Sequence, residues 1–155
     1  MSGMASTSSD ERWIARCLEL AAAAGARGEV PVGAVVVLDG VEIGAGSNRV
    51  EELRSPLAHA EIEALQAALA RAGVKRLPEA ELYCSLEPCF LCAGAILHVR
   101  VRRVVFGARD PKFGAVRSLA NLLEDPRLNH RCEVGEGVGA VASAEMLKAF
   151  FRTRR

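Results

Sequence analysis

The sequence has no long apolar run. Hydrophobic residues make up 50% of its 155 residues, yet no stretch approaches the ~20 consecutive apolar residues that a membrane-spanning helix needs. The first ten residues are rich in serine and lack the apolar core of a secretory signal. We therefore expect a single globular domain located in the cytoplasm, with no membrane partner.

The sequence also lacks a strong excess of charge. Its 20 basic and 19 acidic residues leave a net charge of +1, which neither indicates nor excludes a nucleic-acid partner. Basic residues are nevertheless concentrated in two segments, between Val99 and Arg117 and between Phe150 and Arg155. Either segment alone is more often a solvated surface than a binding site.

Cysteines are few, and their number, five, is odd. In a cytosolic protein such residues are thiols or metal ligands rather than disulfides. Cys84 has apolar neighbours in a predicted strand and Cys17 falls on the apolar face of a predicted helix; we expect these two and Cys132 to be small buried hydrophobic residues. Cys89 and Cys92 are different, because they form a Cys-x-x-Cys motif that follows Pro88.

Local patterns predict alternating helices and strands after a flexible tail over residues 1–9. Helices are expected over residues 10–24, 58–72, 88–98 and 118–123, with a last one capped by Ser143 and running to Phe151. Strands are expected over residues 32–38, 41–47, 81–85, 101–106 and 131–134, the first two joined by an Asp39-Gly40 hairpin turn. This alternation implies α/β layering within one domain over residues 10–155.

The chemistry of the chain is concentrated in a motif that is split between two segments. His59 and Glu61 stand two residues apart at the start of one predicted helix, and Cys89 and Cys92 lie within one turn at the start of another. A helix N-terminus favours thiolate, the form of cysteine that binds metal. The motif therefore predicts a metal site between two helix N-termini, with His59, Cys89 and Cys92 as ligands.

Three protein ligands would leave one zinc position open for water, which is the arrangement of a catalytic site. Glu61 is then free to carry a proton between that water and a leaving group. His-x-Glu combined with Pro-Cys-x-x-Cys is a known signature of zinc-dependent nucleobase deaminases. The alternatives are a redox pair or a closed structural zinc site, whose fourth ligand would have to be Cys84, His98 or His130.

Beyond this signature, most of the chain resembles the bacterial tRNA-specific adenosine deaminases, within the cytidine deaminase superfamily. The zinc motif alone indicates only the superfamily, and the later blocks indicate the tRNA enzymes. The matching blocks lie at residues 30–34, 58–62, 86–89, 92–95, 103–110, 129–131 and 150–155. Arg117, Leu57 and Phe90 depart from the usual pattern of that family.

The resemblance implies a three-layer α/β/α sandwich with a central mixed five-stranded sheet, in a homodimer with one zinc ion per subunit. It implies hydrolytic deamination of adenosine to inosine at the wobble position of a tRNA anticodon loop, with Glu61 as the catalytic residue. It also implies that Asn48 hydrogen-bonds the flipped base. Residues implied to face the anticodon stem-loop are Asp110, Lys112, Asn129, His130, Phe151, Arg152 and Arg154.

Two other functions remain compatible with the same motif. A free-base or nucleoside deaminase acting on cytosine, guanine or cytidine would use an identical zinc site, but would not need the basic C-terminal segment with Phe150 and Phe151. A non-catalytic, zinc-stabilised RNA-binding module would need four protein ligands and would give Glu61 no role.

Overall fold

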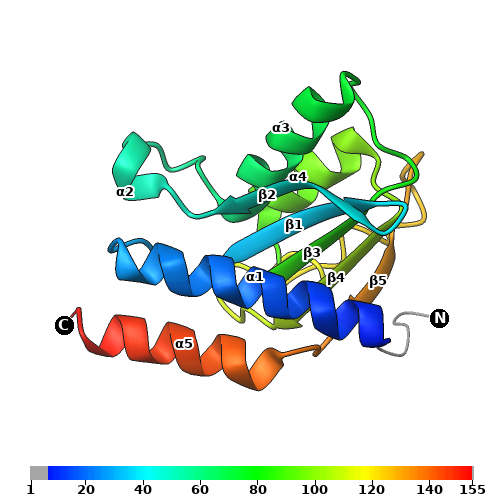
Figure 1. The fold of residues 1–155 in the computed structure, drawn as a ribbon. Coiled ribbons are helices and arrows are strands. Elements are labelled where there is room, and N and C mark those ends of the chain that lie inside the picture. Colours follow the sequence, from blue (N-terminus) through cyan, green and yellow to red (C-terminus); the bar gives the residue numbers. More distant parts are fainter. Residues whose placement is uncertain (1–6, 155) are drawn as a thin grey trace.

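A mixed five-stranded sheet forms the centre of the molecule, in a computed structural model that describes residues 7–154 (Figure 1). The strand order is β2-β1-β3-β4-β5. β1 runs antiparallel to both β2 and β3, whereas β3, β4 and β5 run parallel to one another. The strands are β1 (Gly33–Leu38), β2 (Val41–Ser47), β3 (Glu81–Leu86), β4 (Arg103–Ala108) and β5 (Glu133–Glu136).

Helices cover both faces of this sheet. α1 (Ser8–Ala26) and α5 (Ala140–Arg152) lie side by side on one face, and α3 (Ala60–Ala72) and α4 (Phe90–Val99) lie on the other (Figure 1). A short helix, α2 (Val50–Leu53), follows β2. The layers confirm the predicted α/β/α sandwich with a mixed sheet. None of the described helices has the length and apolar character needed to cross a membrane.

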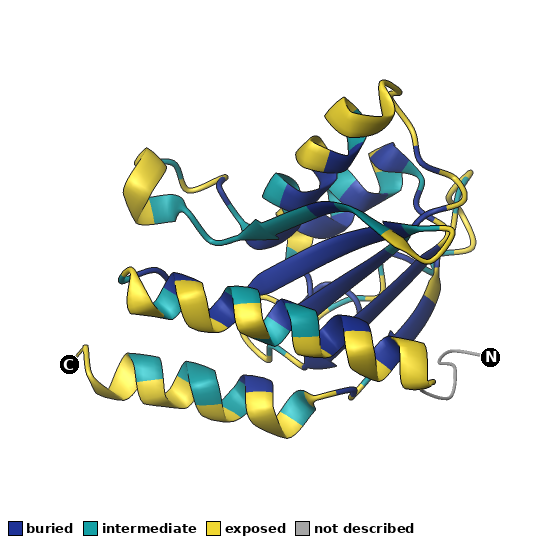
Figure 2. Ribbon diagram, in the orientation of Figure 1, coloured by how far each residue is buried: buried dark blue, intermediate teal, exposed yellow. Residues whose placement is uncertain are grey.

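Alternation along the strands produces two separate cores. On β1, Val36 belongs to the core beneath α3 and α4, while Val35 and Val37 belong to the core beneath α1. Figure 2 shows the result: the strands at the centre of the sheet are buried, and the outer sides of α1 and α5 are exposed. This two-sided burial fixes the positions of the helices that carry the split motif.

A buried ion pair joins α1 to the sheet. Asp10 is 1% exposed, and its carboxylate accepts two hydrogen bonds of 2.8 Å from the Arg103 guanidinium. Tyr83 donates a third, of 3.0 Å, and Arg103 also pairs with Glu81. Because Asp10 additionally completes the capping box with Thr7, one carboxylate both begins α1 and attaches it to β4.

The structure corrects several predicted elements. The helix expected over residues 118–123 is absent, because the N–H groups of Leu119 and Leu122 donate to the carbonyls of Gly114 and Ala115, five and seven residues earlier, and not to carbonyls four residues earlier. Ser143 does not cap the last helix: Gly139 does, and the Ser143 hydroxyl instead donates to the carbonyl of Ser85 at 2.6 Å. α2 was not predicted. Of the predicted tail over residues 1–9, Thr7 caps α1 and residues 8 and 9 belong to it, while residues 1–6 lie outside the described part of the chain.

Candidate metal and nucleobase site

Three ligand atoms meet where α3 and α4 begin, as the split motif predicts. His59 is the N-cap of α3 and Cys89 is the N-cap of α4, with Cys92 in the first turn of α4. The Nδ1 atom of His59 lies 3.5 Å from the Cys89 sulfur and 3.4 Å from the Cys92 sulfur. All the ligand atoms of the three residues lie within 4.8 Å of one another.

This spacing fits a tetrahedral zinc ion. Zinc lies about 2.3 Å from sulfur and about 2.0 Å from nitrogen, so two ligands of a tetrahedron would be about 3.5 Å apart. Within the described residues, the group contains these three side chains and no fourth cysteine or histidine. Cys84, His98 and His130, the three possible fourth ligands, all lie outside this group. The site therefore has the ligands of an open metal centre.

In the contact between the two cysteines, the Cys92 thiol donates a hydrogen bond and the Cys89 sulfur accepts it. Hydrogen bonds with Cys92 and with His59 together outweigh the opposing effect of burial and lower the pKa of Cys89 to about 4. The same contact raises the pKa of Cys92. The hydrogen bond with Cys89 raises the pKa of His59. Cys89 is thus held as a thiolate, the form that binds metal.

Glu61 stands in the first turn of α3, directly beside these ligands. It is 4% exposed, and burial raises its pKa to about 7, with the nearby Cys89 charge acting in the same direction. A carboxyl group with a pKa near neutrality can both accept and release a proton, which is what general acid–base catalysis requires. Its position at a helix N-terminus explains how a residue two positions after His59 reaches the same site.

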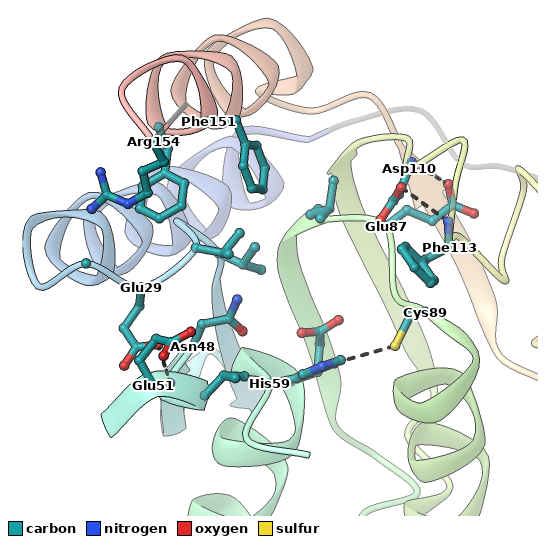
Figure 3. A pocket seen from close by; sticks show the side chains of 17 residues that line it. Glu29, Asn48, Glu51, His59, Glu87, Cys89, Asp110, Phe113, Phe151 and Arg154 are labelled. Carbon is teal, nitrogen blue, oxygen red and sulfur yellow. Dashed lines mark hydrogen bonds between the residues drawn. The ribbon is translucent and has the colours of Figure 1, made fainter. Parts of the chain in front are cut away.

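The metal ligands open into a cavity of about 560 Å³ (Figure 3). Seven of the predicted site residues line it: Asn48, His59, Glu61, Cys89, Asp110, Phe151 and Arg154. They come from the residues just after β2 and β4, the starts of α3 and α4, and the last turn of α5 with the residues that follow it. Segments from almost the entire length of the chain therefore build one cavity.

Asn48 lies on the cavity wall immediately after β2. Its Oδ1 atom accepts a hydrogen bond of 3.0 Å from the backbone N–H of Ala60. Because the oxygen is engaged there, the amide nitrogen faces the cavity as a donor (Figure 3). Asn48 thus both caps the start of α3 and presents a hydrogen-bond donor near Glu61.

The opposite wall comes from the C-terminal end of the chain. Phe151 and Arg154 lie across the cavity from His59 and Cys89 (Figure 3). The Phe150 and Phe151 rings meet edge to face at 5.3 Å, and the Arg154 guanidinium lies 4.0 Å above the Phe150 ring. Phe151 is 50% exposed, so its ring is available for stacking.

Five predicted site residues do not line this cavity: the buried ligand Cys92 and four residues predicted to face the RNA. Arg152 and Lys112 are exposed on α5 and on the loop after Asp110. Asn129 and His130 line a second cavity of about 280 Å³, together with Arg76, His98 and Arg100. The roles predicted for these four residues stay predictions.

Several cavity residues were missed from the sequence. Phe113 is 65% exposed in the loop after β4, and only its exposure distinguishes it from a core residue. Glu29 is 3% exposed and accepts from the backbone N–H groups of Glu51 and Glu52 at 3.0 and 2.9 Å, so it caps α2. Glu87 also lines the cavity. Glu87 belongs to the block over residues 86–89 that resembles the tRNA-specific adenosine deaminases, and its position before Pro88 is the sequence signal that could have identified it.

Most of the basic segment between Val99 and Arg117 is paired with acids of the same chain. Arg103 pairs with Asp10, Arg109 with Glu136 at 2.7 Å, and Arg117 with Glu124 at 2.6 Å. Arg102 likewise pairs with Glu133. These side chains therefore contribute less free positive charge than their number suggests.

Comparison with known proteins identifies relatives over nearly the whole chain. The family model described as MafB19-like deaminase matches residues 8–155. A tRNA-specific adenosine deaminase of Agrobacterium fabrum is 47% identical over 135 residues, which is 87% of this chain and 89% of the relative. One from Bacillus subtilis is 44% identical over 146 residues, covering 94% of this chain and 91% of the relative.

Solved structures agree with these relatives. One from a study of A-to-I editing by tRNA:A34 deaminases superposes with a TM-score of 0.84 at 45% identity, over 88% of this chain and 99% of the other. A guanine deaminase from Nitrosomonas europaea superposes with a TM-score of 0.79 at 29% identity, over 96% and 86%. The chain belongs to the deaminase family that includes the tRNA-specific adenosine deaminases.

Proposed function

We propose that this protein hydrolytically deaminates adenosine to inosine at the wobble position of a tRNA anticodon loop. The single observation that carries the proposal is the composition of the cavity. One wall holds the metal ligands, the buried Glu61 and Asn48, which suffice for a nucleobase. The opposite wall is Phe150, Phe151 and Arg154, which suits neighbouring nucleotides of a longer substrate.

We propose zinc as the metal, one ion per subunit, held by His59 Nδ1 and the sulfurs of Cys89 and Cys92. Zinc bound by three protein ligands supplies Lewis-acid chemistry that makes water a nucleophile near neutral pH. The spacing of the three ligand atoms supports this assignment. The absence of a fourth ligand within the described residues argues against a structural zinc in an RNA-binding module.

Glu61 moves the protons of the reaction. It accepts a proton from the attacking water and delivers it to N1 of the adenine ring, while the remaining hydroxide adds at C6. The C6–N6 bond then breaks, and the amine leaves as ammonia with a second proton passed through Glu61. One water is consumed for each inosine and ammonia formed, so atoms and charges balance.

The other cavity residues would bind and orient the substrate. The Asn48 amide donates a hydrogen bond to the flipped base, and Phe151 stacks on an adjacent base. Arg154 binds phosphate, and the Asp110 carboxylate accepts a hydrogen bond from a ribose hydroxyl, the group that distinguishes RNA from DNA. Lys112, Arg152, Asn129 and His130 are proposed to contact more distant parts of the stem-loop.

We further propose that the protein acts as a homodimer in the cytoplasm. Phe90 and Leu91 are 48% and 40% exposed, and apolar side chains at adjacent exposed positions support burial by a second copy. The five cysteines are all free thiols, which supports a reducing compartment. Sedimentation of the purified protein tests the dimer directly.

The decisive assay uses purified protein and an anticodon stem-loop RNA with adenosine at the wobble position. Inosine formation with one zinc per chain is expected from the wild type. Glu61→Gln should abolish turnover while it preserves zinc content, because the amide keeps the size of the side chain but cannot carry the proton. An inactive wild type with zinc bound would refute the proposal. Loss of zinc from the Glu61→Gln variant would indicate that Glu61 is a metal ligand.

The same assay distinguishes the free-base alternative. The relationship to a guanine deaminase makes guanine the first competitor to test, followed by cytosine and cytidine. Turnover of these compounds at rates that exceed stem-loop turnover, and that do not change with salt, would favour a small-molecule deaminase. An enzyme whose side chains contact the phosphates of the RNA backbone should instead lose RNA affinity steeply as the salt concentration rises.

A further inference from the structure

Glu87 is a buried carboxylate that binds backbone rather than metal or substrate. It is 2% exposed. One oxygen accepts from the N–H of Asp110 at 2.9 Å and from the Ser118 hydroxyl. The other accepts from the N–H groups of Val116, Arg117 and Ser118 at 3.0, 2.7 and 2.9 Å. Five donors thus converge on one side chain, and all belong to residues 110–118.

Residues 110–118 form an irregular loop, which we call the 110–118 loop. It contains no helix or strand that could satisfy these N–H groups internally. A buried N–H group without an acceptor is costly, so the loop depends on Glu87 for its conformation. The two segments are also in close contact, since a Cβ at Gly114 would lie only 2.3 Å from the Glu87 carboxyl carbon.

Glu87 also connects this loop to the metal ligands. It stands two residues before Cys89, and the backbone of Cys89 pairs with Gly114. The N–H of Ala115 donates to the carbonyl of Pro88 at 2.9 Å. The 110–118 loop is therefore attached, at three neighbouring residues, to the segment that begins α4.

The loop in turn carries two side chains into the cavity. Asp110 and Phe113 both line it, beside Cys89 (Figure 3). Asp110 accepts from the N–H groups of Lys112 and Phe113, which closes the turn between them. Asp110 and Phe113 are thus placed by the backbone of the 110–118 loop and not by packing in the core.

We propose that Glu87 is a positioning residue for the RNA substrate: its carboxylate fixes the 110–118 loop relative to the metal site, so that Asp110 and Phe113 meet nucleotides bound in the cavity. This inference rests on the proposed function. It assigns Glu87 to substrate binding through the loop, and not to proton transfer or metal binding.

The test is Glu87→Gln, which keeps the shape of the side chain but places an NH₂ donor among five donors. We expect KM for the stem-loop RNA to rise roughly 10–100-fold while kcat changes less than about 3-fold, because binding groups on the loop are displaced and Glu61 is not. Zinc should stay at one per chain. A merely structural role would instead reduce the folded fraction and kcat together and leave KM unchanged.

Two variants calibrate this result. Ser118→Ala removes one of the five donors and should raise KM about 2–3-fold. Glu133→Gln changes an acid that pairs with Arg102 away from the loop, and should leave KM at the wild-type value. A wild-type KM in Glu87→Gln, or loss of zinc from it, would overturn the inference. If Glu87→Gln does not fold, a wild-type KM in Ser118→Ala overturns it instead.

Amide hydrogen exchange separates this inference from the proposed function. The amides of Asp110, Val116, Arg117 and Ser118 should exchange faster in Glu87→Gln than in the wild type, whether or not RNA is deaminated. An inactive wild type with this exchange pattern would refute the function but retain the role of Glu87 in the loop. Unchanged exchange would refute the role of Glu87 even in an active enzyme.

Discussion

Gly46 offers a direct test of how the sheet positions the catalytic helix. It lies on β2 where α3 passes over the sheet, and a Cβ there would be 2.5 Å from the carbonyl oxygen of Ala60 and 2.6 Å from the nitrogen of Ala64. Ordinary contacts of a Cβ begin near 3.4 Å. Gly46→Ala must therefore move the start of α3 by about 0.9 Å. His59 and Glu61 would move with it and change their positions relative to Cys89 and Cys92.

Two effects should follow from this displacement. Overpacking of this kind lowers the free energy of unfolding by about 1–3 kcal/mol. A misplacement of about 1 Å in a catalytic group lowers the rate by about 10²-fold. Thermal unfolding, zinc content and kcat/KM on the stem-loop RNA measure the two effects separately.

Gly44→Ala is the matched control. A Cβ at Gly44 would be 2.4 Å from the carbonyl oxygen of Ala64, an equally severe clash that lies one helical turn farther from the site. It should destabilise the protein to a similar extent but reduce kcat/KM by less than about 10-fold. Wild-type activity in Gly46→Ala, or equal losses of activity in the two variants, would show that the contact between β2 and α3 does not position Glu61.

Three further predictions concern stability, RNA binding and the metal. Asp10→Ala leaves Arg103 buried without its acid and should lower the free energy of unfolding by about 3–5 kcal/mol at pH 7, measured by urea denaturation. Burial raises the pKa of Asp10, but hydrogen bonds from Arg103 and Tyr83 outweigh it and hold the pKa below its ordinary value. The stabilisation by Asp10 is therefore complete above the unfolded pKa of about 3.9 and is lost as pH falls through the lower folded pKa. Equal destabilisation by the variant at pH 2 and at pH 7 would contradict this prediction. Arg154→Ala should reduce the slope of log affinity against log salt for the stem-loop by about 0.7, measured by fluorescence anisotropy, whereas Arg127→Ala, whose guanidinium pairs with Asp125, should leave the slope unchanged. Chelation of the metal should abolish activity but leave the circular dichroism of a folded chain, because cores on both faces of the sheet remain; cooperative unfolding at 25 °C would instead indicate a structural metal.

The sequence predicted best those features that depend on neighbouring residues. β2 has the predicted bounds, because alternation and the Asp39-Gly40 turn define it locally. The spacing of Cys89 and Cys92 predicted that both sulfurs face one point, whereas their meeting with His59, thirty residues from Cys89, was predicted from the split deaminase signature. The predicted burial of Cys17, Cys84 and Cys132 is also confirmed, and for Cys17 and Cys84 it followed from the apolar pattern in which each lies.

The features that the sequence did not predict depend on contacts between distant residues. The segment over residues 118–123 has helical character, but its Leu119 and Leu122 N–H groups donate to the carbonyls of Gly114 and Ala115 in the preceding loop. That loop is in turn held by Glu87, about thirty residues earlier. Ser143 is a good capping residue in isolation, yet its hydroxyl donates to Ser85 on β3. No local pattern reveals which donor will meet a given buried acceptor, because that pairing is decided by the packing of the complete sheet.

The internal pairing of Arg102, Arg103, Arg109 and Arg117 has a consequence for the search for substrate. A protein with a net charge of only +1 attracts polyanions weakly over long distances, so it should not be retained by the many RNA molecules that lack the right loop. Encounters are then brief, and the time spent on each RNA is determined by how well its loop fills the cavity. Selectivity among many RNA molecules would then come from rapid dissociation of those whose loops do not fit the cavity. Added bulk RNA should therefore reduce the deamination rate of this enzyme less than that of an enzyme with a continuous basic surface.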